Sequence, residues 1–547
     1  MQDKQIQTAQ RVFSALATGV GIWLLWDSAS LRLVTYSLWA DYWEHTAALT
    51  EWMRDLLAPG NPHVADQSGS ARYIPSFLVL AALGRAVDLG PIELMAINAL
   101  VNYGLIVVGI YLFATSYFRN PWAPAVLFLV LLSGWGVPWI WSNLYELRSF
   151  FVTASYPSTT AFGLSLIALW ITLGFMRGRL PFFASLGVLL LMSALVFVTH
   201  ALTGVFAIVS CCLLALAEHE EPISLRALLI AVMGGGALLA ELWPFFSVWD
   251  VILASSEELD DRTWQPFAGI SGMLERARSG VWFHMFYDPR QVLVSLGPAL
   301  LGIPVCGWLL VKRQHRFIVA GLVIMLLPMA LNVFFQVALA HRFLLYAVFF
   351  MHLALTWLVL EAFSNWSAGR RERRVTIKQR ISVFIASCAL LSLAVFHSGL
   401  LMADHEGLHL DHRLQLVNKR RVLPDTMSVP ELYSALTDPI PENAVVIGDG
   451  RLTWPLPTFR GKAVSLPANH ENSLLLDQFD RVAAEKTFLA ASTQAAKRRA
   501  IVDRYGVTHV LINTERTEAG LISWLQANTK LVIEIGPYRM HAVHAPS

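Results

Sequence analysis

Up to residue 402 the chain consists of long apolar stretches, and polar residues are confined to the segments between them. A helix that crosses a membrane needs roughly 20 consecutive apolar residues. Eleven stretches are close to this length: 12–27, 92–117, 122–142, 159–176, 181–199, 201–217, 226–247, 293–311, 317–339, 343–363 and 381–402. The stretch 76–89 is shorter and charged, which favours a re-entrant or surface helix. The pattern predicts a polytopic α-helical membrane protein of about 11 spans.

The pattern changes after residue 402, where short apolar runs alternate with amphipathic ones. Strands are expected at 444–447, 463–466, 509–512 and 531–535, and helices at 485–505 and 518–529. Alternation of this kind predicts a small α/β domain. We therefore expect two domains: a transmembrane domain over 1–402, with long outer loops at 28–91 and 248–292, and an extracytoplasmic α/β domain over 403–547.

Composition excludes the soluble classes. Of the 547 residues, 55% are hydrophobic and 15% are charged, with a mean hydropathy of +0.52. Soluble domains carry roughly 25% charged residues, so this chain cannot coat globular cores of its size with polar side chains. The formal net charge of +2 gives no field for nucleic acid, and no nucleic-acid partner is expected. The four cysteines lie in apolar runs and predict neither disulfides nor a metal framework.

Basic residues in the short loops orient the spans. If the N-terminus is inside and 76–89 does not cross, the basic loops all fall on one side, as the positive-inside rule requires. These loops contain Lys4, Arg11, Arg119, Arg177, Arg179, Arg226, Lys312, Arg313, Arg316 and the cluster at 370–380. The N-terminus is then cytoplasmic, and the C-terminal domain lies outside.

The first outer loop opens with the acidic and aromatic run Trp39-Ala40-Asp41-Tyr42-Trp43-Glu44-His45. Flanking aromatic rings favour the membrane surface, so the carboxylates would lie beside lipid headgroups. A carboxylate there can accept a proton from an incoming hydroxyl, as a general base does. The alternative is that Asp41 caps the following helix and that the other charges are merely solvated. Asp41 and Glu44 are candidate catalytic residues, and His45 is a candidate for acceptor contact.

Cationic candidates lie at two outer span ends. His200 separates two apolar runs, and His341 and Arg342 close another. An ionisable group at such a depth is a functional candidate by default. The guanidinium of Arg342 can make two parallel hydrogen bonds to a phosphate, so a lipid phosphate is its favoured ligand. A neutral core histidine and a snorkelling arginine are the structural alternatives.

Two further acids lie near outer helix ends. Glu146 is a candidate catalytic acid, although it could simply pair with Arg148, and Glu241 is a candidate for acceptor contact or support. The sequence has no P-loop, GxGxxG, GxSxG or HExxH motif. Nothing in it therefore indicates nucleotide hydrolysis, hydride transfer, or serine or zinc hydrolysis.

This arrangement resembles the GT-C glycosyltransferases, particularly the bacterial members with a periplasmic C-terminal domain. The resemblance implies an enzyme of the bacterial inner membrane and cell envelope. It would move a hexosyl or pentosyl group from a polyprenyl-phosphate donor to a hydroxyl of a glycan, lipid or protein, with inversion. Asp41 matches the family's acid in the first outer loop, and His200 and Arg342 match basic residues near the donor phosphate.

One departure concerns a second acid that relatives often have at the outer start of the fourth span. Here that position reads Ser155-Tyr156-Pro157-Ser158, so either Glu146 substitutes or the site uses a single acid. No cofactor is certain, and a divalent cation, Mg²⁺ or Mn²⁺, stays open.

Two other classes stay open besides the glycosyltransferase. An O-antigen polymerase or ligase acting on lipid-diphosphate glycans would use an arginine-rich outer loop. The loop at 248–292 contains Arg262, Arg276, Arg278 and Arg290. A transporter is less favoured, because paired helix breaks and mid-span acids are not evident in the sequence.

Overall fold

The computed structural model describes residues 2–30, 41–136, 145–147, 150, 153–218, 222–257, 296–331, 342–372, 427–465 and 477–544. Contacts divide the chain into two compact units. The first comprises Met1–Trp26, Ala99–Leu242 and Ser255–Leu408. The second comprises Asp27–Asn98, Trp243–Ala254 and His409–Ser547.

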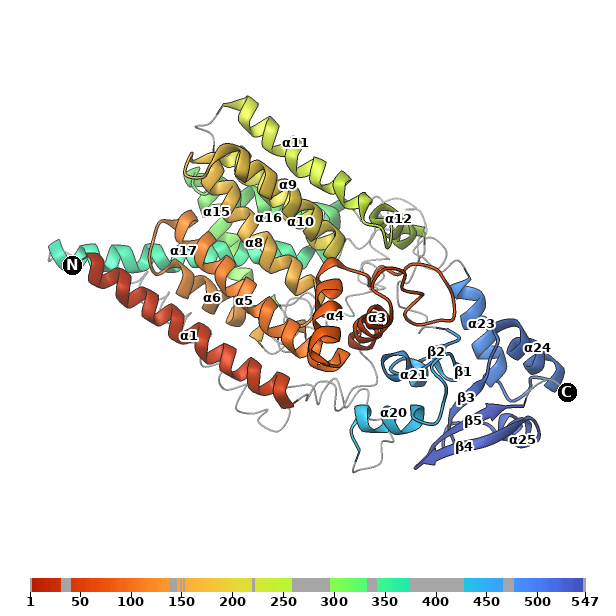
Figure 1. Cartoon of the computed structure of the whole chain (residues 1–547). Helices are drawn as coiled ribbons and strands as arrows, with labels where there is room; N and C mark the ends of the chain where they lie inside the picture. The colour runs from red at the N-terminus through yellow and green to blue at the C-terminus, as the bar shows by residue number, and fades with distance from the viewer. Residues whose placement is uncertain are drawn as a thin grey trace, which may run out of the picture. The chain divides into compact units, whose positions relative to one another are not determined.

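The first unit is built from apolar helices (Figure 1). They are α1 (Gln2–Ser30), α5 (Pro91–Phe118), α6 (Ala123–Ser133), α8 (Pro157–Met176), α9 (Phe182–Thr199), α10 (Ala201–Ala217), α11 (Ile223–Leu239), α15 (Gly302–Lys312), α16 (Arg316–Leu331) and α17 (Phe343–Glu372), with the 3₁₀ turns η1 (Ala240–Leu242) and η3 (Gly297–Leu301). Five described helices are long and apolar enough to cross a membrane: Pro91–Phe118, Pro157–Met176, Phe182–Thr199, Ile223–Leu242 and Phe343–Ser364. The polytopic helical class is confirmed. The count of eleven spans stays a prediction, and 381–402 lies outside the described residues.

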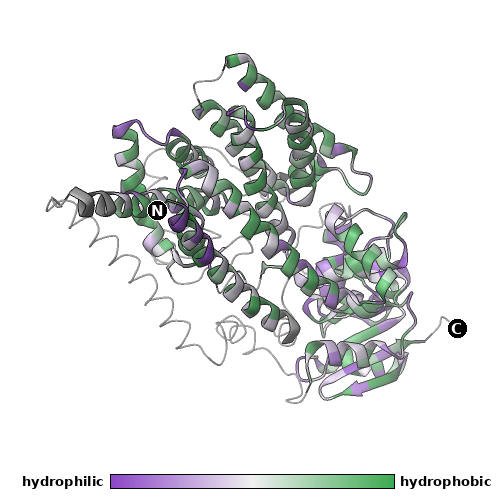
Figure 2. Ribbon diagram, turned by 60° about the vertical axis from the view of Figure 1, so that its left-hand side comes forward, coloured by the Kyte–Doolittle hydropathy of each residue, from purple (hydrophilic) through white to green (hydrophobic). Residues whose placement is uncertain are grey.

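Apart from the polar start of α1 and the polar end of α17, these helices are apolar on all sides, which distinguishes a membrane bundle from a soluble one. Figure 2 shows hydrophobic colour around most of their surfaces. In α8 and α17, 83% of the most apolar window is buried, whereas 28% is buried in α11. The outward side chains include Phe183, Ile223 and Val311, which are 85%, 80% and 78% exposed. Exposed apolar residues of this size fit contact with lipid.

Polar contacts show which helix ends lie together. Arg177, after α8, forms an ion pair of 2.8 Å with Glu218, after α10, and donates to the carbonyl of Ser116 near the end of α5. His315, before α16, lies 3.2 Å from the hydroxyl of Tyr117. The loops that contain Arg177, Arg179 and Arg313 thus lie at one end of the unit, in agreement with the predicted grouping of basic loops.

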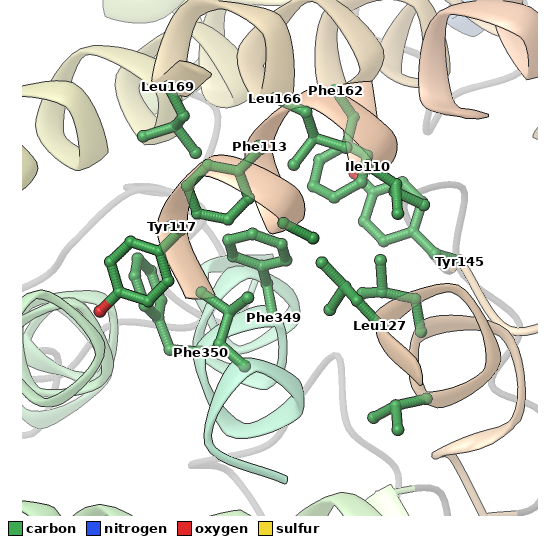
Figure 3. Close-up of a cluster of buried hydrophobic side chains, with 14 of the residues drawn as sticks. Ile110, Phe113, Tyr117, Leu127, Tyr145, Phe162, Leu166, Leu169, Phe349 and Phe350 are labelled. Atoms are coloured by element: carbon green, nitrogen blue, oxygen red, sulfur yellow. The ribbon is translucent and has the colours of Figure 1, made fainter. Parts of the chain in front are cut away.

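Aromatic rings fill the core of this unit (Figure 3). Tyr145 stacks on Phe162 of α8 with 3.8 Å between ring centroids. Phe162 stacks on Phe206 of α10, and Phe206 stacks on Tyr346 of α17 at 4.6 Å. Stacked rings from three helices and one loop fix those helices in register at the end that contains His200.

The second unit contains a five-stranded sheet with strand order β2-β1-β3-β5-β4. The strands are β1 (Val445–Ile447), β2 (Lys462–Ala463), β3 (His509–Asn513), β4 (Thr529–Ile535) and β5 (Tyr538–Val543). β1 pairs in parallel with β2 and β3, and β5 pairs antiparallel with β3 and β4. The helices are α3 (Tyr42–Arg54), α4 (Pro75–Val87), α12 (Val248–Glu257), α20 (Val429–Thr437), α21 (Gly450–Thr453), α22 (Leu456–Phe459), α23 (Gln478–Leu489), α24 (Ala495–Tyr505) and α25 (Ala519–Asn528).

Three of the four expected strands of the C-terminal region are present, as β1, β3 and β4, together with β5, which was not expected. The strand expected at 463–466 differs, because β2 covers only Lys462–Ala463 and overlaps the prediction only at Ala463. The prediction of one helix over 485–505 is wrong, because α23 ends at Leu489 and α24 begins at Ala495. The backbone turns extended at Ala490, and the buried guanidinium of Arg498 donates to the carbonyls of Phe488 and Ala490. This side chain satisfies carbonyls at the end of α23 that a continuous helix would satisfy internally. The expected short helix at 76–89 is α4, whose 13 residues span about 20 Å, less than a bilayer core.

The first outer loop belongs to the same unit as the C-terminal residues. Its residue Val64 forms a parallel bridge with Ala463 of β2, and the N–H of Ala463 donates to the carbonyl of His63 at 2.7 Å. The loop therefore covers the β2 edge of the sheet. The sequence gives no sign of this pairing, which joins segments far apart in the chain.

Candidate functional site

Asp41 occupies the N-cap position of α3, in the second unit. Its backbone carbonyl accepts from the N–H groups of Glu44 and His45, at 3.0 and 3.2 Å. Its carboxylate makes no capping hydrogen bond to the helix. The sequence left open that the Asp41 side chain merely caps α3, and the structure contradicts this alternative. This carboxylate is half-buried and lies at the N-terminal end of α3.

The other two residues of this turn have packing roles. Glu44 is fully buried, and its carboxylate accepts from Arg72 at 2.5 and 2.8 Å. A buried carboxylate needs such a partner because desolvation is costly. His45 is also buried and packs edge-on against Phe77, with 5.5 Å between centroids. Of the three candidates on this turn, only Asp41 is partly exposed.

In the first unit His200 is joined to Tyr346 through the hydroxyl of Thr203, and Arg342 lies one helical turn before Tyr346. His200 is the N-cap of α10, and its Nδ1 accepts from the backbone N–H of Thr203 at 3.2 Å. The Thr203 hydroxyl lies 2.7 Å from the same nitrogen and 2.7 Å from the hydroxyl of Tyr346. Tyr346 lies one helical turn after Arg342, within range of electrostatic interaction with its guanidinium. Of the two predicted phosphate ligands, His200 is thus hydrogen-bonded into this network, and Arg342 interacts electrostatically with Tyr346.

The direction of these hydrogen bonds indicates which ring nitrogen of His200 has the proton. A backbone N–H can only donate, so Nδ1 of His200 has no proton and the neutral ring has its proton on Nε2. The Thr203 hydroxyl then donates to Nδ1, and Tyr346 donates to Thr203. His200 presents Nε2 as a donor, which is the role that an anionic ligand requires.

Arg342 also has a hydrogen-bond donor that could meet an anionic ligand. Its Nε is buried and has no hydrogen-bond partner among the described residues. A buried N–H group in this condition is rare in native proteins and is expected to meet an acceptor. Sequence reasoning missed Thr203 and Tyr346, although their spacing of three from His200 and four from Arg342 on helices was the available signal.

The remaining candidates are placed as follows. Glu146 is buried, on a short segment beside the stacked ring of Tyr145, and its carbonyl accepts from the N–H of Phe150. Arg148, its expected partner, lies outside the described side chains, and so does His341. Glu241 is half-buried in the turn η1 after α11.

The position where relatives often have a second acid is occupied by hydroxyl and amide groups. The amide of Asn102 donates to the carbonyl of Ala154 at 2.8 Å, and its oxygen accepts from Thr160 at 2.7 Å. These contacts fix the backbone before α8. Within 153–160 the chain has no carboxylate.

Among the described residues, no three or more His, Cys, Asp and Glu side chains form a group that could hold a metal ion. Carboxylate oxygens are the ligands that Mg²⁺ and Mn²⁺ prefer. No step below is assigned to a metal.

The structure therefore forms two groups from the predicted residues. Asp41, Glu44 and His45 share the first turn of α3; His200 is part of the hydroxyl network, and Arg342 lies one helical turn before its member Tyr346. The first group belongs to the second unit, and the second group to the first unit.

No protein-family model matches the chain, and no curated protein sequence matches it. Solved structures do. The arabinofuranosyltransferase AftD from Mycobacteria has a TM-score of 0.53 at 15% identity, covering 97% of this chain and 40% of that one. ArnT from Cupriavidus metallidurans bound to undecaprenyl phosphate has a TM-score of 0.47 at 14% identity, covering 97% and 98%. The oligosaccharyltransferase AglB from Archaeoglobus fulgidus, in complex with an inhibitory peptide and a dolichol-phosphate, has a TM-score of 0.47 at 11% identity, covering 97% and 74%.

The likeness to AftD is the one on which the fold assignment rests. It extends over almost the whole chain, although the chain spans less than half of AftD. The chain has the fold of the GT-C membrane glycosyltransferases, as the sequence predicted. Together with its apolar helices, this makes the chain an integral membrane protein.

Proposed function

We propose that the chain is a glycosyltransferase that moves a hexosyl or pentosyl group from a polyprenyl-phosphate donor to an acceptor hydroxyl on the outer face of a bacterial inner membrane. The observation that carries the proposal is the pair of donors formed by His200 and Arg342 near Tyr346. Nε2–H of His200 and the buried Nε–H of Arg342 lie at the ends of helices in the apolar first unit. A lipid phosphate matches both properties, because its head requires donors and its tail requires apolar surface. The fold, shared with an arabinofuranosyltransferase, supports sugar transfer.

In the proposed reaction the carboxylate of Asp41 takes the proton of the acceptor hydroxyl. The acceptor oxygen attacks the anomeric carbon from the face opposite the phosphate, and the bond from that carbon to the phosphate oxygen breaks. Inversion follows from this single displacement. Arg342 and His200 stabilise the negative charge that develops on the departing polyprenyl phosphate, as donors aimed at a leaving group do. Glu44, paired with Arg72, supports the turn and does not take the proton.

The test is sugar transfer by purified protein supplied with polyprenyl-phosphate sugars. Donors are chosen from those that accumulate in a strain lacking the gene. Asp41→Asn is expected to lower kcat by about a hundredfold or more, the usual size of a general-base contribution. The matched control is Asp88→Asn, on the same loop at an exposed position with φ of 57°, where asparagine is tolerated. Full turnover by Asp41→Asn would refute the base assignment.

A separate measurement concerns the donor. Arg342→Gln is expected to weaken binding of the polyprenyl monophosphate by about tenfold or more, because a charged hydrogen bond to phosphate is lost. A protein that prefers a lipid-diphosphate glycan over the monophosphate would instead support the polymerase or ligase class.

A further inference from the structure

The first turn of α3 is held by α22 of the C-terminal region, through side chains that the proposed chemistry does not use. We propose that Thr458 and Lys462 are positioning residues: the C-terminal region fixes α3 and thereby the carboxylate of Asp41. The proposal rests on the proposed function only for the role of Asp41. All of the contacts involved lie inside the second unit.

Two buried hydroxyls make the central contact. The Thr458 hydroxyl lies 2.7 Å from that of Thr46, and both residues are at most 4% exposed. The Thr46 hydroxyl also lies 3.1 Å from each of two carbonyls of its own helix, those of Tyr42 and Trp43. Either hydroxyl can be the donor of the contact between Thr46 and Thr458. The Thr458 hydroxyl also lies 3.4 Å from the carbonyl of Trp43, two residues from Asp41.

The same face of α3 makes further contacts with α22. Thr50 donates to the carbonyl of Thr458 at 2.9 Å, and the ring of Trp43 packs on that of Phe459. Trp43, Thr46 and Thr50 are spaced three and four residues apart, so they lie on one helix face. This face points to α22, whereas His45 and Trp52 pack against other parts of the first loop and the segment after α11.

A mostly buried ion pair closes the far end of the contact. Nζ of Lys462 lies 2.6 Å from the carboxylate of Glu51 and donates to the carbonyl of Asn61 at 2.6 Å. The two side chains are 13% and 14% exposed. Burial lowers the pKa of Lys462, and the charge of Glu51 opposes that shift. Glu51 also pairs with Arg54 at 3.1 Å, so it is the removal of Glu51 that leaves the ammonium group of Lys462 mostly buried without its ion-pair partner.

These contacts determine where the first turn can lie. A helix held only at its C-terminal end would pivot, and displacement of a catalytic group by about 1 Å can lower the rate a hundredfold. Thr458 acts at the end next to Asp41, and Lys462 acts at the opposite end. The C-terminal region is therefore part of the active-site scaffold.

The test combines hydrogen exchange with kinetics on the full-length protein in detergent. In Thr458→Val the amides of 42–46 are expected to exchange about fivefold faster, the effect of losing one buried hydrogen bond. Thr458→Ser retains the hydroxyl and should restore the protection. Thr517→Val is the matched control, since its hydroxyl bonds only to the carbonyl of Asn513 among described residues. Lys462→Glu combined with Glu51→Lys should retain more protection than either single variant.

In the sugar-transfer assay Thr458→Val should lower kcat while the KM for the donor is unchanged. Unchanged exchange at 42–46, or an equal increase throughout the C-terminal region, would overturn the proposal. So would faster exchange accompanied by full kcat. If the wild-type protein transfers no sugar, the proposed function fails, whereas the exchange comparison still decides whether Thr458 and Lys462 position α3.

Discussion

The carboxylate of Glu485 lies between the hydroxyl of Ser465, which donates to it, and the N–H of Gly450, which donates at 2.8 Å. Burial is the largest influence on this group and raises its pKa to about 7. The hydrogen bonds and Lys486 act in the opposite direction, and the charge of Asp449 acts in the same direction as burial. The group is thus poised to titrate in the physiological range.

This shift has a definite sign for stability. A carboxyl group whose pKa is higher in the folded state contributes stability below its unfolded value, near 4.5, and that contribution is lost as the pH rises through about 7. Glu485→Gln should therefore remove a loss of Tm between pH 5 and pH 8 that the wild-type protein shows. The comparison is the difference between variant and wild type, because His509 and His541, whose pKa values are lowered by desolvation, also contribute to the pH dependence of both proteins. Exposed Glu442→Gln is the control, and parallel pH profiles for Glu485→Gln would contradict the prediction.

At the same scale, the sequence identified residue types better than it identified partners. Asp41 was recognisable because an acid between aromatic residues opens an outer loop. The pairing of Glu44 with Arg72 could not be recognised in the sequence, because the two residues are 28 positions apart and a turn lies between them. Tyr346 was also missed, because a tyrosine in an apolar helix looks like core until a hydroxyl from another helix meets it.

Helices α5 and α8 show how an element is positioned by its smallest residues. A Cβ on Gly109 would lie 2.7 Å from the Cβ of Leu166, and one on Gly163 would lie 2.8 Å from the Cβ of Leu105. Each glycine thus lets the other helix approach closely, as small residues do at membrane helix crossings. The crossing positions the start of α8 beside Asn102, which fixes the segment before it.

Gly109→Leu should therefore lower the stability of the bundle by roughly 1–3 kcal/mol, the usual effect of overpacking. The measurement is the thermal unfolding midpoint of purified protein in detergent. Gly104→Leu on the same helix is the matched control, because nothing lies within 4 Å of a Cβ there. Equal midpoints for the two variants would contradict the prediction, because they would show that α5 and α8 can move apart at Gly109 without loss of stability.

Among the elements, those with a strong local signal were predicted well. The break between α9 and α10 falls at His200, as the apolar runs indicated. β5 was missed, although the glycine and proline at 536–537 mark a turn before it. The break after Leu489 depends on Arg498 of α24, which donates to the carbonyls of Phe488 and Ala490. A local sequence pattern does not show such a contact between two helices.

For the whole molecule, the orientation in the membrane is a prediction from the basic loops, to which the structure adds the contacts that join some of these loops. The ion pair between Arg177 and Glu218 and the contact between His315 and Tyr117 place the neighbouring loops at one end of the first unit. The positive-inside rule assigns that end to the cytoplasm. The rule acts on each loop separately, whereas the contacts require the loops to share a side. The predicted orientation therefore requires the loops that contain Arg179 and Arg313 to lie on the same side of the membrane.

Single cysteines test this prediction with a membrane-impermeant maleimide on intact spheroplasts. Leu57→Cys, at a position 89% exposed in the first loop, and Glu442→Cys are expected to be labelled from outside. Arg179→Cys and Arg313→Cys should be labelled only after permeabilisation. The unsubstituted protein is the control for its native cysteines. Labelling of both arginine positions from outside would reverse the orientation and remove Asp41 from the outer face. Labelling of only one would contradict the packing that joins their loops.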